Sequence, residues 1–105
     1  MTDTVRKDLV IVGGGPAGLS AAIYAQRSLL DAVTLEREAV GGQVILTSEV
    51  DNYPGVPHAD GFSLVDAMHA QATDLGAQVV MDPVSSVERD EATGRFLVRG
   101  ASACY

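Results

Sequence analysis

Three glycines near the N-terminus have the spacing that binds the pyrophosphate of a dinucleotide. Gly13, Gly15 and Gly18 form a G-x-G-x-x-G pattern directly after a short apolar run. The first permits a tight turn, the second lets backbone N–H groups reach a phosphate, and the third lets a helix lie close to a strand. The helix N-terminus that follows offers unpaired N–H groups and a partial positive charge. Pro16 suits the first turn of this helix, where its missing N–H costs nothing.

An acidic residue stands where such a site needs a group that binds the sugar. Glu36 closes the next apolar run, eighteen residues after Gly18. A carboxylate there accepts hydrogen bonds from the two hydroxyls of a ribose and disfavours the 2′-phosphate of NADP. The alternative is an ordinary glycine-rich turn with Glu36 as a surface charge. The apolar run before the glycines and the helix-forming run after them favour the dinucleotide site.

A strand, a helix and a second strand must position these residues. Residues 9–12 are continuously apolar, as in a strand of a parallel sheet that is covered on both faces. Residues 17–30 predict a helix with an alanine-rich face, and residues 32–35 predict the strand that ends at Glu36. This is the size of a βαβ unit, about 30 residues, so we expect parallel strands and a right-handed crossover. The sequence predicts an α/β, Rossmann-like fold.

The segments outside this unit predict a frayed start, a long loop and an antiparallel meander. Residues 1–6 are polar, and we expect them to fray. Residues 37–57 form a connection rich in glycine and proline, in which residues 44–47 are interpreted as a short strand. A third parallel strand is expected at residues 77–81. An incomplete meander follows, with strands at 84–89 and 96–99 and the opening of another at 103–105.

Residues 61–75 predict the second helix of the fold. Their apolar residues recur on one face, and Gly76 is well placed to end the helix. Ser63 is interpreted as the capping residue, with Asp66 three positions later in a near capping-box pattern. His69 borders the apolar face, so we expect it to be a half-buried structural residue.

Length and composition are typical of one small globular domain and exclude several classes of function. The chain has 105 residues, is 47% hydrophobic and has a mean hydropathy of +0.16. Its net charge is −7 and it shows no basic stripe, which argues against a nucleic-acid partner. We find no apolar run near the ~20 residues that span a membrane, and no signal peptide. The expectation is a cytoplasmic protein that does not contact a membrane.

Disulfide and metal chemistry have little support in the sequence. Cys104 is the one cysteine, so neither an internal disulfide nor a Cys-x-x-Cys pair can form. His58 and His69 lie apart and have no cysteine companions, which disfavours a zinc site. The sequence offers no residue to which a catalytic role can be assigned.

Four blocks of sequence together resemble the N-terminal part of thioredoxin-reductase-like flavoproteins, over nearly the whole chain. The pairing of Gly-Gly-Gln with Val-Asp-Asn-Tyr-Pro-Gly is the specific part of this resemblance. The four blocks are residues 13–18 with 21–25, Glu36, residues 41–43 and residues 49–55.

This resemblance implies that residues 1–105 are the N-terminal portion of a domain that binds FAD. It places the pyrophosphate along residues 14–17, the adenosine ribose at Glu36 and the adenine at the Val84 backbone. The ribityl chain and flavin ring would lie near Gln43 and Asn52. The implied cofactor-binding residues are Gly13, Gly14, Gly15, Pro16, Ala17, Gly18, Glu36, Gly42, Gln43, Asn52 and Val84.

In this family, hydride passes from NADPH to FAD, and electrons then pass to a Cys-x-x-Cys pair that reduces thioredoxin. The sequence lacks that pair, and we expect the NADPH domain and the C-terminal FAD segment to be missing as well. A homodimer is a further family expectation. The alternatives are a ferredoxin–NADP reductase-like fragment, a nucleotide-binding module without catalysis, and a truncated chain that folds poorly.

Overall fold

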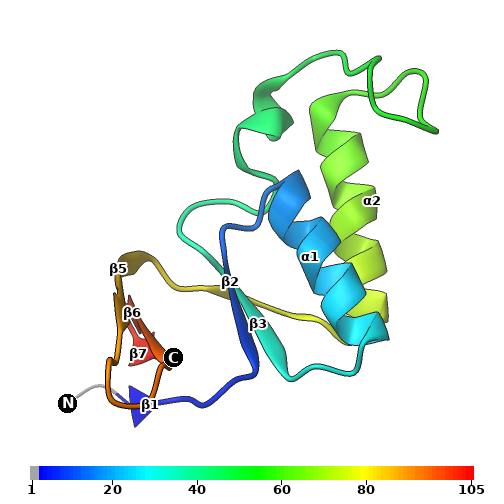
Figure 1. Cartoon of the computed structure of the whole chain (residues 1–105). Coiled ribbons are helices and arrows are strands. Elements are labelled where there is room, and N and C mark those ends of the chain that lie inside the picture. The colour runs from blue at the N-terminus through cyan, green and yellow to red at the C-terminus, as the bar shows by residue number, and fades with distance from the viewer. Residues whose placement is uncertain (1–2) are drawn as a thin grey trace.

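The computed structural model describes residues 3–105 and shows two helices, a parallel sheet and a separate meander (Figure 1). The elements, in chain order, are β1 (Asp3–Thr4), β2 (Leu9–Val12), α1 (Pro16–Arg27), β3 (Ala32–Glu36), the 3₁₀-helix η1 (Gly42–Leu46), α2 (Gly61–Asp74), β4 (Gln78–Met81), β5 (Val84–Arg89), β6 (Phe96–Gly100) and β7 (Ala103–Cys104). This confirms the predicted α/β architecture.

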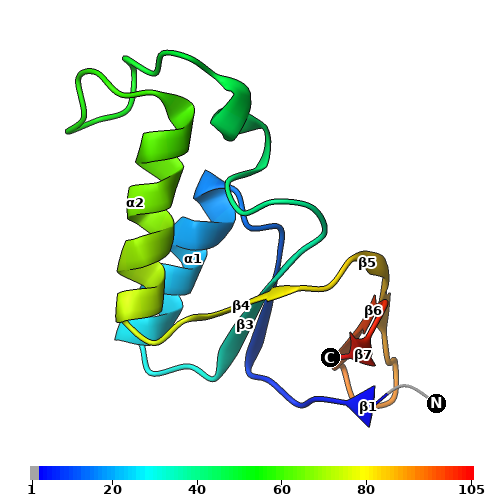
Figure 2. The same cartoon turned by 180° about the vertical axis from the view of Figure 1, so that it is seen from behind.

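The parallel sheet has the order β2-β3-β4, as expected for a Rossmann-like βαβ unit. Val12 pairs with Leu35, so β2 and β3 end at the same edge of the sheet. In Figure 2, which shows the sheet from behind, β4 lies along β3. The carboxyl ends of parallel strands form the edge at which open α/β sheets bind ligands.

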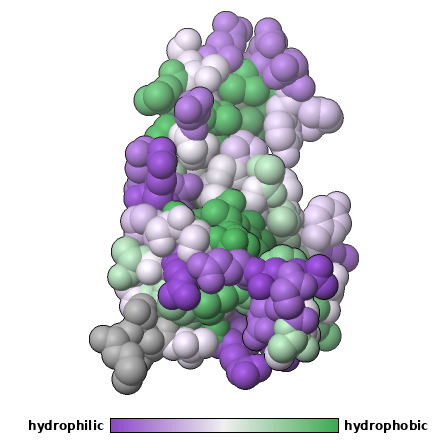
Figure 3. Space-filling view, turned by 60° about the vertical axis from the view of Figure 1, so that its left-hand side comes forward, coloured by the Kyte–Doolittle hydropathy of each residue, from purple (hydrophilic) through white to green (hydrophobic). Residues whose placement is uncertain are grey.

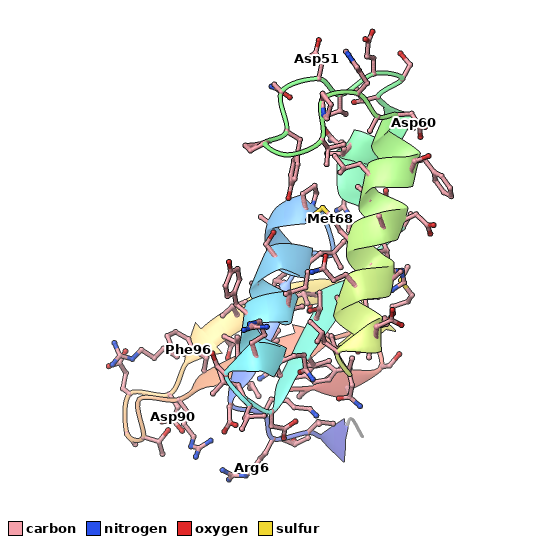
Figure 4. All side chains as sticks on the ribbon, turned by 90° about the vertical axis from the view of Figure 1, so that its right-hand side faces the viewer. Arg6, Asp51, Asp60, Met68, Asp90 and Phe96 are labelled. Atoms are coloured by element: carbon pink, nitrogen blue, oxygen red, sulfur yellow. The ribbon has the colours of Figure 1, made fainter. Side chains whose placement is uncertain are left out.

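Helices α1 and α2 pack side by side on one face of this sheet. Their core contains Leu19 and Ala22 from α1 and Val65 and Met68 from α2, all buried. Figure 4 shows Met68 between the two helices. A Cβ on Gly18 would stand 1.8 Å from the Gly13 carbonyl oxygen, so the third glycine is what allows α1 to approach the turn after β2.

The meander lies on the other side of the parallel sheet. Strand β5 pairs antiparallel with β6, and β6 pairs antiparallel with β7. Val98 of β6 packs against Val33 and Leu35 of β3 in a second, smaller core. Val33 and Leu35 of β3 therefore face the meander, while the helices cover the other face of the parallel sheet.

Residues 1–6 were expected to fray, and the described part of this segment is ordered instead. Asp3 and Thr4 form β1, which pairs parallel with Ala103 and Cys104 of β7. Residues 1 and 2 lie outside the described residues. Strand pairing over about 100 residues of sequence leaves no local pattern in a polar segment, so the sequence could not indicate it.

Residues 44–47 do not form the predicted strand. Residues 44–46 belong to the 3₁₀-helix η1, and Thr47 is its C-cap, whose N–H bonds the Val44 carbonyl at 3.0 Å. Short apolar runs are ambiguous between helix and strand, and packing decides between them. Val44 and Ile45 pack against the α1–α2 core, and a Cβ on Gly61 of α2 would stand 1.7 Å from the Val44 carbonyl oxygen.

The boundaries of the two helices also differ from the sequence expectation. Helix α1 spans Pro16–Arg27 rather than residues 17–30. In α2 the N-cap is Asp60, not Ser63, because the Asp60 carboxylate accepts the Ser63 N–H at 2.8 Å. The expectation for Gly76 is confirmed, since its φ of +95° and its N–H bond to the Thr73 carbonyl end the helix. His69 is half-buried, also as expected.

Candidate functional site

The glycine turn joins β2 to α1 at the carboxyl edge of the parallel sheet. Gly13 has a φ of +107°, which only glycine adopts freely, and its N–H bonds the Leu35 carbonyl at 2.8 Å. Gly15 is the N-cap of α1 and has no side chain that could satisfy the first-turn N–H groups. A Cβ on Gly15 would meet only the Gly41 carbonyl oxygen, at 3.8 Å. The space beside Gly15 is therefore a cradle that any side chain would occupy.

The Glu36 side chain points toward this cradle. Its Oε1 accepts the Gly14 N–H at 2.9 Å and its Oε2 accepts the Glu38 N–H at 2.8 Å. The side chain is 8% exposed, and each carboxylate oxygen keeps a lone pair for a further donor. The acidic residue at the end of β3 is thus in direct contact with the glycine turn.

Several opposing effects set the charge of Glu36. Burial raises its pKa, but hydrogen bonds from the backbone N–H groups of Glu38, Gly14 and Arg37, together with the Arg37 charge, outweigh burial. The pKa of Glu36 is lowered as a result, and the side chain is ionised at neutral pH. An ionised carboxylate at this position accepts hydrogen bonds from hydroxyl groups and disfavours a phosphate in the place of those hydroxyls.

A hollow of about 520 Å³ opens beside the turn, which is a size typical of small-ligand sites. Of the predicted residues, Gly13, Glu36, Gly42, Gln43 and Val84 line it. The remaining glycine-turn residues, from Gly14 to Gly18, lie at the adjoining start of α1. Strands β3 and β5 and the helix η1 thus converge on one concave surface.

Asn52 does not line this hollow. It lies in the loop between η1 and α2, is exposed, and neighbours the bridge between Tyr53 and Val56. Figure 4 shows the adjacent Asp51 at the far end of the molecule, near Asp60. The interpretation of Asn52 as a flavin contact remains a prediction.

The hollow also includes residues that the motif did not single out. Apolar side chains come from Val12, Ile45 and the 83% exposed Leu46, and charge comes from Arg37. Arg37 follows Glu36 directly, so its position could have been read from the sequence. Ile45 and Leu46 could not, because their segment was assigned to a strand rather than to η1.

The donor set of the hollow suits an anion joined to a sugar rather than a metal. Backbone N–H groups at the start of α1 face the cradle, and Glu36 stands at its side. Among residues 3–105 we find no cluster of His, Cys, Asp and Glu that could hold a metal ion. In the same range, no helix is long and apolar enough to cross a membrane. The groups present fit the pyrophosphate and ribose of a dinucleotide.

The family model of the pyridine nucleotide-disulphide oxidoreductases matches residues 7–101. A thioredoxin reductase from Peptoclostridium acidaminophilum is 48% identical over 93% of this chain and 31% of its own length. A Clostridium pasteurianum relative, described as a 34.2 kDa protein in the rubredoxin operon, is 44% identical over 85% of this chain and 28% of its own length. The chain thus spans about a third of the length of the curated relatives it matches.

Solved structures show the same similarity. The Lactococcus lactis thioredoxin reductase, in its FR conformation, matches with a TM-score of 0.88 and 32% identity. The match covers 95% of this chain and 32% of that protein. The Gloeobacter violaceus thioredoxin reductase matches with a TM-score of 0.84 and 34% identity, over 94% of this chain and 31% of that protein.

Proposed function

This chain belongs to the pyridine nucleotide-disulphide oxidoreductase family, and we propose that it is the FAD-binding portion of a thioredoxin reductase. The observation that carries the proposal is the Glu36 carboxylate, bonded to the Gly14 N–H of the glycine turn. The contact supports the proposal because the carboxylate proposed for the ribose stands beside the turn proposed for the pyrophosphate, at one strand edge. The thioredoxin reductases among the relatives favour this reading over a ferredoxin–NADP reductase-like fragment or a module without catalysis.

In the proposed complex, residues 14–17 lie along the pyrophosphate. The N–H groups of Gly15 and Ala17 and the dipole of α1 hold it, because the Gly14 N–H is already bonded to Glu36. Glu36 accepts hydrogen bonds from the hydroxyls of the adenosine ribose, and the Val84 backbone borders the adenine. Gly42 and Gln43 lie on the side of the ribityl chain and the flavin ring, and Asn52 would have to approach from its loop.

FAD bound in this way supplies the hydride acceptor of the family's reaction. In this proposal the residues of the glycine turn, Glu36 and Val84 bind and orient that group. The use of NADPH, the redox-active cysteine pair and the reduction of a thioredoxin-like disulfide are proposed for the whole enzyme, of which this chain corresponds to about a third. A homodimer is proposed for that whole enzyme as well.

The test is a titration of the purified chain with FAD, followed by flavin fluorescence. We expect binding with a dissociation constant above about 1 µM, because the hollow is open and association must offset lost rotational and translational freedom. Glu36→Gln should weaken binding at least about tenfold by removing a charged hydrogen-bond acceptor. Glu49→Gln, which changes an exposed carboxylate outside the hollow, is the matched control. Equal affinity of the Glu36 and Glu49 variants would refute the assignment.

A further inference from the structure

Glu36 and Asp82 are the two buried carboxylates in the described part of the chain. Glu36 belongs to the proposed cofactor site, whereas Asp82, which is 1% exposed, lies outside that site. It does not line the hollow. A buried carboxylate is retained only where hydrogen bonds compensate for the loss of water, so its partners indicate what it does.

The partners of Asp82 come from the last turn of the meander. Its Oδ1 accepts the Ser102 N–H at 2.9 Å and its Oδ2 accepts the Tyr105 hydroxyl at 2.8 Å. The Ser102 bond is the main cause of the lowered pKa of Asp82, and the Ala101 and Ala103 N–H groups contribute to it. The carboxylate is therefore bonded to the turn between β6 and β7 at Ser102 and to the chain after β7 at Tyr105.

The backbone of β6 lies close against the Asp82 carboxylate. A Cβ on Gly100 would stand 2.4 Å from Asp82 Oδ2, so a glycine is needed where the carboxylate meets β6. Gly100 is also the residue that pairs with Val84, next to an irregularity in the β5–β6 register. The turn that Asp82 holds is thus joined directly to the strand that enters the hollow.

The backbone around Asp82 connects the same turn to Glu36. The Asp82 N–H bonds the Glu36 carbonyl at 2.9 Å, and the Pro83 carbonyl accepts the Ala101 N–H at 3.0 Å. Two residues after Asp82, Val84 lines the same hollow as Glu36. The segment of residues 82–84 is therefore anchored to the parallel sheet at one end and to the meander at the other.

We propose that Asp82 is a positioning residue of the cofactor site: its carboxylate holds the turn of residues 100–103 and so keeps Val84 at the adenosine end of the hollow. This inference rests on the proposed function. Asp82 acts through the backbone and touches no cofactor atom. Removal of the Asp82 carboxylate should displace Val84 from the adenosine end of the hollow. The pyrophosphate cradle at the start of α1 is built from other elements and should stay in place.

The test compares two ligands that both carry phosphate, of which only one contains adenosine. ADP carries the adenosine half of FAD, and FMN carries the flavin half. Asp82→Asn keeps an acceptor for Ser102 but offers an N–H₂ group, which cannot accept a bond from the Tyr105 hydroxyl. We expect this variant to bind ADP at least about tenfold more weakly and FMN within about twofold of the wild type, because small displacements of a binding wall have large effects.

Two further variants make the test decisive. Tyr105→Phe removes one bond to Asp82 and should weaken ADP binding in the same direction, with an effect that is not additive with that of Asp82→Asn. Asp74→Asn, at an exposed site of α2, is the control and should change neither affinity. If Asp82→Asn does not fold, the ADP and FMN affinities of Tyr105→Phe test the inference instead.

Unchanged ADP affinity in the Asp82 and Tyr105 variants would overturn the inference. An equal loss for ADP and FMN would also overturn it, because it would show that Asp82 only stabilises the fold. A wild-type chain that binds neither FAD nor ADP would instead refute the proposed function, and the inference with it.

Discussion

At the scale of single residues, Glu36 combines a structural and a binding role. Its two oxygens accept N–H groups from Gly14 and Glu38, so the charge helps to hold the turn even without a ligand. The lowered pKa of Glu36 means that the folded state favours the ionised form. Ionisation therefore contributes stability above the pKa of the unfolded chain, about 4.3 for glutamate, and this contribution is lost as the pH falls through the lower folded value.

The pH dependence gives a first prediction. Glu36→Gln should lower the free energy of unfolding by roughly 1–2 kcal/mol at pH 7, the range for hydrogen bonds to a charged group. The difference from the wild type should shrink as the pH falls from about 4.3 through the lower pKa of the folded state, below which the wild-type carboxyl is protonated too. Urea unfolding at a series of pH values measures it. A difference that stays constant with pH would contradict the role of the Glu36 charge.

Two glycines of the turn should respond differently to the same substitution. Gly18→Ala places a Cβ 1.8 Å from the Gly13 carbonyl oxygen and should cost about 3 kcal/mol of stability. Gly15→Ala meets nothing closer than 3.8 Å and has a φ of −79°, so the fold should tolerate it. Its methyl group would fill the cradle, and FAD binding should be lost. Urea unfolding and FAD titration of both variants separate the two effects, and a Gly15 variant that binds FAD normally would contradict the placement of the pyrophosphate.

At the scale of elements, the start of α2 shows where a sequence pattern misleads. Asp60 accepts both the N–H and the hydroxyl of Ser63, and the Ser63 bonds lower the pKa of Asp60. Asp60→Ala should therefore lower the urea midpoint of unfolding, since it removes the N-cap. Asp66→Ala, at the residue that the capping-box pattern selected, should leave the midpoint nearly unchanged. A larger effect at Asp66 would show that the capping assignment is wrong.

The sequence was most informative where structure is determined locally. The glycine turn, the strand that ends at Glu36 and the helix stop at Gly76 follow from backbone geometry that neighbouring residues fix. These positions could be predicted from residue type and spacing alone. Spacing placed the glycine turn and Glu36 at the same carboxyl edge of the parallel strands, but the direct bond between Glu36 and Gly14 was not predicted.

The sequence was least informative where distant segments decide the structure. The η1 helix forms because Val44 and Ile45 pack on the α1–α2 core, and β1 forms because it pairs with β7. The role of Asp82 could not be predicted, because an Asp-Pro pair is typical of an ordinary turn. The bond to the Tyr105 hydroxyl is seen only in the folded chain. Each of these features depends on a contact that no local pattern encodes.

At the scale of the whole molecule, the two sheets leave apolar surface uncovered. Val12, Val87 and Phe96 are each more than half exposed, and together with Val10 and Tyr105 they line a hollow of about 440 Å³ beside β2. Figure 3 shows hydrophobic surface in the middle of this face, bordered by hydrophilic side chains. Within residues 3–105, β2 pairs with β3 alone, so its other edge is open as well.

Exposed edges and apolar patches promote association between chains. We therefore predict that the isolated chain self-associates as its concentration rises and that Phe96→Asp reduces this association. Phe62→Asp is the matched control, because Phe62 is 63% exposed and Phe96 is 65% exposed, but Phe62 lies on α2, away from the β2 edge. Sedimentation velocity of both variants tests this. Equal behaviour of the two variants would mean that the β2 edge does not drive association.

The most direct test of the account is an amide NMR titration of the wild-type chain with ADP. We predict that the N–H signals of Gly14, Gly15 and Ala17 shift together with those of Glu36 and Val84, while signals of the hairpin tip at Asp90 stay in place. Shifts confined to the hairpin tip, or no shifts at millimolar ADP, would contradict the claim that the start of α1 and Glu36 form a dinucleotide site.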